Sequence, residues 1–177
     1  CRDYGLLAAV SGEYKGRVIL PYTVGRNVVS WTGRAIGESS LRYFDLSKEA
    51  SIVSPKNTLY NFNCTRRGGK VLLVCEGPFD AIKLDFYSKK HGIRSVALST
   101  NSITDEQTYL LEEVSVNFER VLMVMDNGNS VGVIDSMKLK EKLAQIHNIG
   151  FTNVPIQFKD GGEMPPKAVD NFVRGLL

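Results

Sequence analysis

The side chains most able to carry chemistry are acids that directly follow apolar runs. Glu76 follows the apolar run at 71–75, and Asp126 follows the apolar run at 121–125. Asp160 follows a further hydrophobic segment and is a third candidate. Carboxylates gathered at one place repel one another unless a cation lies among them. Mg²⁺ suits such a place, because it is a hard ion that accepts carboxylates, water and substrate phosphates together. The spacing therefore predicts a divalent-metal site that includes Glu76 and Asp126.

Each of these acids also has a purely structural explanation. An acid in the first turn of a helix stabilises the helix dipole by about 0.3–1 kcal/mol without any further function. For a single acid this explanation would be preferred. Two acids at neighbouring strand ends, each close to glycines that let a phosphate approach, favour the metal site instead.

The elements that must position these acids follow a regular alternation after residue 69. Continuous apolar runs alternate with segments of helical spacing, which indicates βαβ units and a buried parallel sheet. We predict strands at 70–75, 95–98, 120–125 and 153–158, and helices at 80–87, 104–114, 131–147 and 165–173. Ala81, Ile82, Leu84 and Phe86 are expected to face inward from the first helix. In such a sheet, ligands bind outside the carboxyl ends of the strands, where the acids lie.

The first 67 residues have a different pattern. Strand-like runs at 16–23 and 27–33 flank Gly25, which predicts a hairpin, and 43–46 and 59–62 are weaker strand candidates. The polar, glycine-rich residues 66–69 mark a joint. We therefore predict an α/β protein with a smaller basic mixed α+β subdomain at 1–67, a parallel-sheet domain at 68–160 and a C-terminal helix at 161–177.

Composition excludes several classes of protein. The hydrophobic fraction of 43% and the charged fraction of 23% are typical of a soluble globular chain. The longest apolar runs are far shorter than a membrane span. The three cysteines lack CxxC spacing and there are only two histidines, so we expect neither zinc nor a disulfide framework. No secretory signal pattern opens the chain, and a reducing, cytoplasmic setting fits best.

The formal net charge of +3 is unevenly distributed. Residues 1–67 carry ten Lys and Arg against five Asp and Glu, whereas residues 68–177 carry twelve against fourteen. A basic front half beside a mildly acidic back half suggests a polyanionic partner and a separate acidic site. On charge alone, an uneven scatter of solvated side chains explains the pattern equally well.

Several motifs in order carry a resemblance to a known family. Residues 76–81 (EGPFDA) resemble the first motif of the TOPRIM domain, the fold shared by bacterial-type primases, topoisomerases and some nucleases. Residues 97–111 resemble the stretch that follows in primases, and 125–132 (MDNGNSVG) resemble the second motif, usually DxDxAG. Residues 16–37 and 41–61 are similar to the basic subdomain that precedes TOPRIM in DnaG-type primases. Motifs in the right order are more specific than any one of them.

The resemblance implies the catalytic core of a bacterial or phage DNA primase, which copies single-stranded DNA into a short RNA primer from nucleoside triphosphates. It implies Mg²⁺ or Mn²⁺ as cofactor, no membrane, and a replicative helicase as partner through segments outside these residues. The implied catalytic residues are Glu76, Asp80 and Asp126, with Glu76 either ligating metal or acting on the attacking hydroxyl. The implied metal ligands are Glu76, Asp126, Asn127 and Asn129. The basic candidates for binding nucleic acid or triphosphate are Arg34, Arg42, Lys56, Lys15 and Arg26.

The second motif departs from the pattern. If Gly132 matches its final glycine, the two acidic positions are Asn127 and Asn129; if Asp126 is the first acid, the second acid is missing. An amide oxygen can ligate a metal but brings no charge, so we expect weaker metal affinity. Two alternatives to a primase therefore stay open. One is a non-catalytic nucleic-acid-binding module with a degenerate metal site, and the other is a TOPRIM nuclease or topoisomerase.

Overall fold

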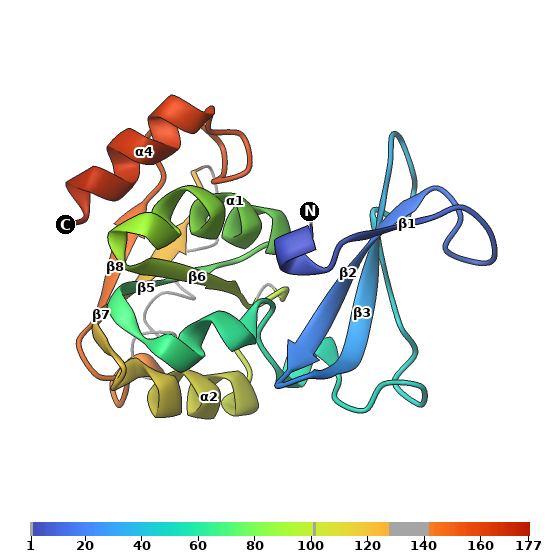
Figure 1. The fold of residues 1–177 in the computed structure, drawn as a ribbon, viewed down its shortest axis with the longest axis horizontal. Helices are drawn as coiled ribbons and strands as arrows, with labels where there is room; N and C mark the ends of the chain where they lie inside the picture. The colour runs from blue at the N-terminus through green and yellow to red at the C-terminus, as the bar shows by residue number, and fades with distance from the viewer. Residues whose placement is uncertain (1, 101, 128–141) are drawn as a thin grey trace.

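The computed structural model describes residues 2–100, 102–127 and 142–177 and contains two four-stranded sheets (Figure 1). Most of the helix predicted at 131–147 and the candidate ligand Asn129 lie outside the described residues. The predicted fold class, a parallel α/β unit preceded by a smaller mixed subdomain, is confirmed. The proposed domain limits at 67 and 160 stay a prediction, although one sheet lies on each side of residue 67.

The first sheet is antiparallel, in the order β1-β2-β3-β4. Its strands are β1 (Leu7–Ala9), β2 (Arg17–Val24), β3 (Asn27–Ala35) and β4 (Tyr43–Asp45). The predicted hairpin is present, because Val24 pairs with Asn27 across a two-residue turn. Gly25 takes a φ of 64° in that turn, a conformation that glycine adopts without strain.

The strand predicted at 59–62 is wrong. Only Tyr60 forms a bridge there, pairing with Ala97. Asn61 then adopts a left-handed φ of 61°, which ends extended backbone, and the 3-10 helix η3 (Phe62–Arg67) follows.

The second sheet is parallel, in the order β6-β5-β7-β8. It is built from β5 (Gly69–Cys75), β6 (Ile93–Ala97), β7 (Phe118–Met125) and β8 (Ile149–Asn153). Helices α1 (Pro78–Ser88) and α4 (Pro166–Gly175) cover one face, and α2 (Asp105–Ser115) covers the other (Figure 1). The short 3-10 helices are η1 (Arg2–Tyr4), η2 (Pro55–Asn57) and η4 (Lys89–His91).

Strand β5 shows why its sequence is continuously apolar. Val71, Leu73 and Cys75 belong to the core cluster that includes α1 and α4 residues. Leu72 and Val74 belong to the cluster on the α2 side. Because successive side chains point to opposite faces, a strand covered on both sides must be apolar throughout. The first of these clusters also contains Leu20 and Tyr22 of β2, so the two sheets share one core.

Two predictions about the parallel half are corrected. The fourth strand lies at Ile149–Asn153 instead of 153–158, because the chain turns at Val154 and Pro155, whose carbonyls accept hydrogen bonds from the Asn127 side chain. Phe86 does not face inward and is 51% exposed. It packs edge-on against Tyr87, while the inward positions of α1 are taken by smaller side chains and Asp85.

The start of α2 agrees with the sequence. Thr104 accepts a hydrogen bond from the Gln107 backbone, and the Gln107 side chain accepts one from the Thr104 backbone, which is the predicted capping box. Among the helices within the described residues, none has the length and apolar content needed to span a membrane.

Candidate active site

Glu76 and Asp126 follow neighbouring parallel strands. Glu76 comes directly after β5 and Asp126 directly after β7, and these two strands pair in the sheet. Glu76 is exposed and Asp126 is half-buried. Both acids therefore lie at the carboxyl edge of the sheet, where a ligand of an open parallel sheet binds.

The loop at 159–163 adds a further acid to this edge. The Gly162 N–H donates to Asp80 Oδ1 at 2.6 Å, and the Lys83 Nζ donates to the Gly162 carbonyl at 2.7 Å. A Cβ built on Gly162 would lie 3.0 Å from Asp80 Oδ1 and 3.2 Å from Asp160 Oδ1. The loop can approach α1 this closely because residue 162 is a glycine. Asp80 and Asp160 are thereby brought together, although they are 80 positions apart in the sequence.

The electrostatics of these acids show that they share a confined space. Burial, followed by the charges of Asp80, Glu76 and Asp160, raises the pKa of Asp126 to about 7 against a lowering by Lys159. Burial and the charge of Asp160 raise the pKa of Asp80 to about 6, although two backbone N–H groups oppose the shift. A cation at this edge would favour the ionised form of each group.

The donors fit a hard divalent ion in kind. Carboxylate oxygens are the ligands that Mg²⁺ and Mn²⁺ take, and the charges of neighbouring carboxylates contribute, after burial, to the raised pKa values of Asp80 and Asp126. Across residues 2–100, 102–127 and 142–177, no three acidic, histidine or cysteine side chains are gathered closely enough to enclose an ion. The acids are thus neighbours at one edge but do not form a closed coordination shell.

Asn127 has a structural role. Its Nδ2 donates to the carbonyls of Val154, Pro155 and Phe158 at 2.9, 3.1 and 2.9 Å, and its backbone N–H donates to the Lys159 carbonyl at 2.8 Å. These hydrogen bonds hold the end of β7 against the segment that precedes Asp160. Only its Oδ1 is left to ligate a metal, as an uncharged donor.

Of the basic candidates, Arg34 lies beside the acids. The Arg34 guanidinium of β3 lies 4.7 Å from the Tyr43 ring centre and 5.7 Å from that of Phe79, the residue before Asp80. Burial raises the pKa of Tyr43, Arg34 and Arg42 lower it, and Asp80 raises it, so all three charges act on one hydroxyl. Arg34 therefore lies beside the acidic edge, and Arg42, which is exposed directly before β4, is the sequence neighbour of Tyr43.

The other three basic candidates lie elsewhere. Lys15 is in the connection before β2, and Arg26 is at the β2–β3 turn, which Asn63 holds through its hydrogen bonds to Gly25. Lys56 lies in η2, and its carbonyl accepts a hydrogen bond from Thr104 at 2.9 Å. All three side chains are exposed, and no contact among the described residues ties them to the acids.

Sequence reasoning missed three hydroxyl residues at this edge. A pocket of about 180 Å³ between the two sheets is lined by Glu76 together with Tyr22, Thr32 and Ser99. The hydroxyls of these three residues are buried, and apart from the interaction between Tyr22 and Ser99 none has a hydrogen-bond partner among the described residues. Buried polar groups are normally paired, so a water molecule or a polar ligand would satisfy them. Tyr22 and Thr32 carried no signal, because they belong to β2 and β3, which are distant in the chain from Glu76, whereas Ser99 directly follows the strand predicted at 95–98.

Comparison with known proteins identifies the fold. No family model and no curated protein matches the sequence. Among solved structures, the Escherichia coli primase catalytic core is 22% identical with a TM-score of 0.65, and the alignment covers 98% of this chain and 54% of that one. The RNA polymerase domain of Mycobacterium tuberculosis primase DnaG is 16% identical with a TM-score of 0.71, covering 97% and 56%. The bacteriophage T7 primase fragment is 17% identical with a TM-score of 0.60, covering 99% and 68%.

The chain spans about half the length of the bacterial primase structures that it matches. The similarity extends over nearly all of this chain. The chain therefore has the fold of a DnaG-type primase catalytic core.

Proposed function

We propose that this chain is the catalytic core of a DNA primase, which makes short RNA primers on single-stranded DNA by metal-dependent nucleotidyl transfer. The observation that carries the proposal is the acidic edge formed by Glu76, Asp80 and Asp126, with Arg34 of the other sheet beside it. Similar structures support it, since one is a DnaG primase catalytic domain bound to single-stranded DNA. Another contains bacteriophage T7 primase domains bound to an RNA/DNA hybrid and dTTP. Such a reaction belongs where the genome is copied, which is the cytoplasm of a bacterium or of a phage-infected cell.

In this reaction the 3′-hydroxyl of a primer attacks the α-phosphate of a nucleoside triphosphate, and pyrophosphate leaves. Glu76 is the exposed carboxylate at the edge and is placed to ligate metal or to accept the hydroxyl proton. Asp126 and Asp80 would hold the ion with it, and Arg34 and Arg42 would bind phosphates. A bound Mg²⁺ or Mn²⁺ supplies positive charge that offsets the charge of the reacting phosphates.

One observation favours a second candidate, a non-catalytic nucleic-acid-binding module. The Asn127 amide donates to three carbonyls, and if Gly132 matches the final glycine of the second motif, this uncharged residue stands at its first acidic position. A metal site with fewer charged ligands binds its ion more weakly. Under this candidate, the chain binds DNA through its basic half and makes no primer.

Metal titration separates the two candidates. Isothermal titration with Mn²⁺ should show weak binding that strengthens when a nucleoside triphosphate adds phosphate oxygens. Glu76→Gln keeps the shape of the side chain and removes its charge, so it should weaken Mn²⁺ binding by about tenfold or more and abolish primer synthesis. The matched control is Glu112→Gln, which removes the same charge from an exposed position of α2.

The outcomes are distinct. Equal Mn²⁺ affinity in the wild type and Glu76→Gln would eliminate Glu76 as a ligand and favour the non-catalytic module. Cleavage of the template in place of primer synthesis, lost in Glu76→Gln and kept in Glu112→Gln, would identify a TOPRIM nuclease.

A further inference from the structure

A second polar pocket lies at the opposite edge of the parallel sheet. It has a volume of about 620 Å³ and is lined by Asp3, Asn61, Asn63, Cys64, Arg66, Arg67 and Arg94. Arg66 and Arg67 precede β5, and Arg94 is the second residue of β6, so the pocket lies where the strands begin. Strand β5 has seven residues, which separates this pocket from the Glu76 edge by about 20 Å.

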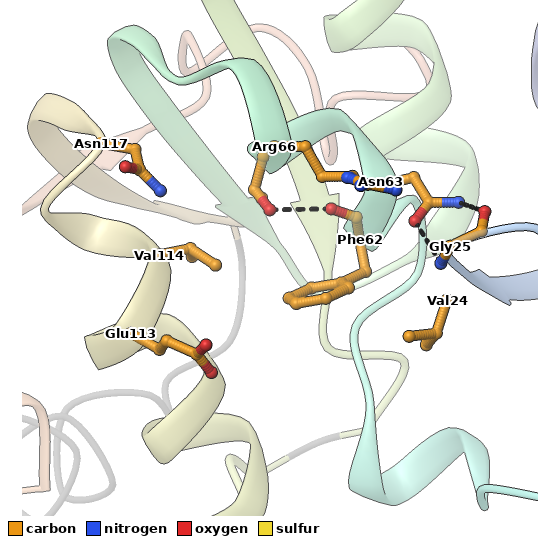
Figure 2. A pocket seen from close by; sticks show the side chains of 9 residues that line it. Val24, Gly25, Phe62, Asn63, Arg66, Glu113, Val114 and Asn117 are labelled. Atoms are coloured by element: carbon orange, nitrogen blue, oxygen red, sulfur yellow. Dashed lines mark hydrogen bonds between the residues drawn. The ribbon is translucent and has the colours of Figure 1, made fainter.

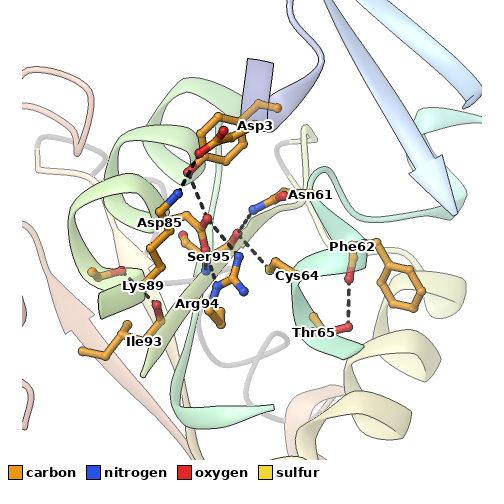
Figure 3. Close-up of polar contacts among 12 residues, drawn as sticks. Asp3, Asn61, Phe62, Cys64, Thr65, Asp85, Lys89, Ile93, Arg94 and Ser95 are labelled. Carbon is orange, nitrogen blue, oxygen red and sulfur yellow. Dashed lines mark hydrogen bonds and ion pairs between the residues drawn. The ribbon is translucent and has the colours of Figure 1, made fainter. Parts of the chain in front are cut away.

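Arg94 is held in place by a buried carboxylate (Figure 3). Its Nε and Nη2 donate to the two oxygens of Asp85 at 2.8 and 3.1 Å. Asp85 is 1% exposed and also accepts hydrogen bonds from the Tyr4 hydroxyl and the Ser95 backbone. The guanidinium is therefore fixed in orientation, and its third nitrogen, Nη1, has no partner among the described residues.

The charges around the pocket leave an excess of two positive side chains. Arg94 is balanced by Asp85, and Asp3 is balanced by Lys89, whose Nζ lies 2.8 Å from Asp3 Oδ2. Arg66 and Arg67 are exposed at the end of η3 and have no ion-pair partner within the described part of the chain. Two adjacent unpaired arginines beside a fixed third one form a concave surface that attracts anions.

We propose that this pocket binds phosphate groups, either as free polyphosphate or as part of a nucleotide or nucleic-acid strand. The planar guanidinium fork pairs with two phosphate oxygens at once, which suits arginine to this ligand. No aromatic ring is among the described residues that line the pocket, so these residues offer no surface on which a base could stack and would recognise charge rather than base identity. Its volume is within the range of small-molecule sites and accommodates more than one phosphate.

The neighbouring pocket on the other side of η3 has different chemistry (Figure 2). It is lined by Phe62, Val24 and Val114 together with polar residues, and its one arginine, Arg66, is shared with the basic pocket. Phosphate binding therefore belongs to the basic pocket, where Arg66, Arg67 and Arg94 meet.

The test is titration of the metal-free protein with inorganic pyrophosphate. In the double variant Arg66→Ala/Arg67→Ala, the Kd should rise at least about tenfold, because two charge-assisted contacts are lost. The matched control Lys48→Ala/Lys167→Ala removes the same charge from exposed positions that do not line the pocket, and its Kd should stay within about twofold of the wild type. Binding should also shift the Nε–H resonance of Arg94, and it should persist in Glu76→Gln, whose site is at the other edge.

Two further ligands identify the source of the phosphate. If a nucleoside triphosphate follows the same variant pattern as pyrophosphate, the pocket takes free polyphosphate. If only the Kd of a single-stranded oligonucleotide follows this variant pattern, the pocket binds the phosphate backbone of a nucleic-acid strand. Either result supports the proposal. The proposal is overturned if no ligand is weakened in Arg66→Ala/Arg67→Ala beyond the control, or if the control loses binding equally. Neither outcome bears on primer synthesis, so failure here is separate from failure of the proposed function.

Discussion

The two acids with raised pKa values repel their neighbours in the folded chain. Asp126 is half-buried, and burial followed by the charges of Asp80, Glu76 and Asp160 raises its pKa from 3.8 to about 7. Between those two values the folded state binds more protons than the unfolded state. The free energy of unfolding therefore falls as the pH rises through this window, and the whole loss is present above the folded-state pKa.

Asp126→Asn should remove this destabilisation. In metal-free buffer, we expect the variant to melt about 2–4 °C above the wild type near pH 8, with little difference near pH 4. Thermal melts followed by circular dichroism at both pH values measure it. Glu38→Gln, at an exposed position between β3 and β4 and outside any helix, is the control and should show no such dependence. A difference in melting temperature between Asp126→Asn and the wild type that is the same at both pH values would contradict the burial of this charge.

Asp85 is the most consequential buried acid. It accepts hydrogen bonds from Arg94, Tyr4 and the Ser95 backbone. Asp85→Ala leaves these donors unpaired and should lower the free energy of unfolding by about 3–5 kcal/mol, measured by urea denaturation. Replacing both charges in Asp85→Leu/Arg94→Met should recover much of that loss, because no buried charge is then left alone. A double variant as unstable as Asp85→Ala would show that packing, rather than charge, dominates here.

At the scale of elements, the joint between the two sheets depends on glycine. Gly68 has a φ of 61°, and a Cβ at that position would collide with the Asn117 carbonyl. Gly68→Ala should therefore lower the free energy of unfolding by at least about 1–2 kcal/mol. Gly175→Ala is the matched control, because a Cβ at position 175 would meet no atom within 4 Å. Position 175 is also helical, and alanine is more stable in a helix than glycine. Chemical denaturation of both variants compares them. Equal stability of Gly68→Ala and the wild type would mean that η3 and β5 can shift apart at the joint.

At the scale of the whole molecule, the basic excess of residues 1–67 should govern DNA affinity. We expect weak binding of single-stranded DNA that falls steeply with salt. Arg34→Glu/Arg42→Glu should lower affinity for all sequences alike and reduce the magnitude of the log–log salt slope by about 1.4, from two lost phosphate contacts. Fluorescence anisotropy at several salt concentrations measures the slope. Lys48→Glu/Lys167→Glu serves as the control of equal charge change, and an unchanged slope in the arginine variant would argue against phosphate contacts there.

The parallel half and the position of its two principal acids could be predicted from the sequence alone. Strands buried on both faces must be continuously apolar, so β5 and β7 were visible in the chain, and the residues after them had to meet at one edge. The capping box of α2 was visible for a similar reason, because its hydrogen bonds join residues three apart. These features depend on short-range periodicity, which the sequence displays directly.

Contacts between residues that are distant in the sequence could not be predicted in this way and became clear from the three-dimensional fold. The 159–163 loop brings Asp160 to Asp80, Arg34 approaches Phe79 from the other sheet, and Asp85 pairs with Arg94. Each contact depends on the path of the chain through turns and loops, and no local spacing encodes that path. The exposure of Phe86 and the earlier start of β8 were mispredicted for the same reason, since packing against neighbouring elements overrides local pattern. The hydroxyl-lined pocket and the basic pocket exist only because segments far apart in sequence form their walls.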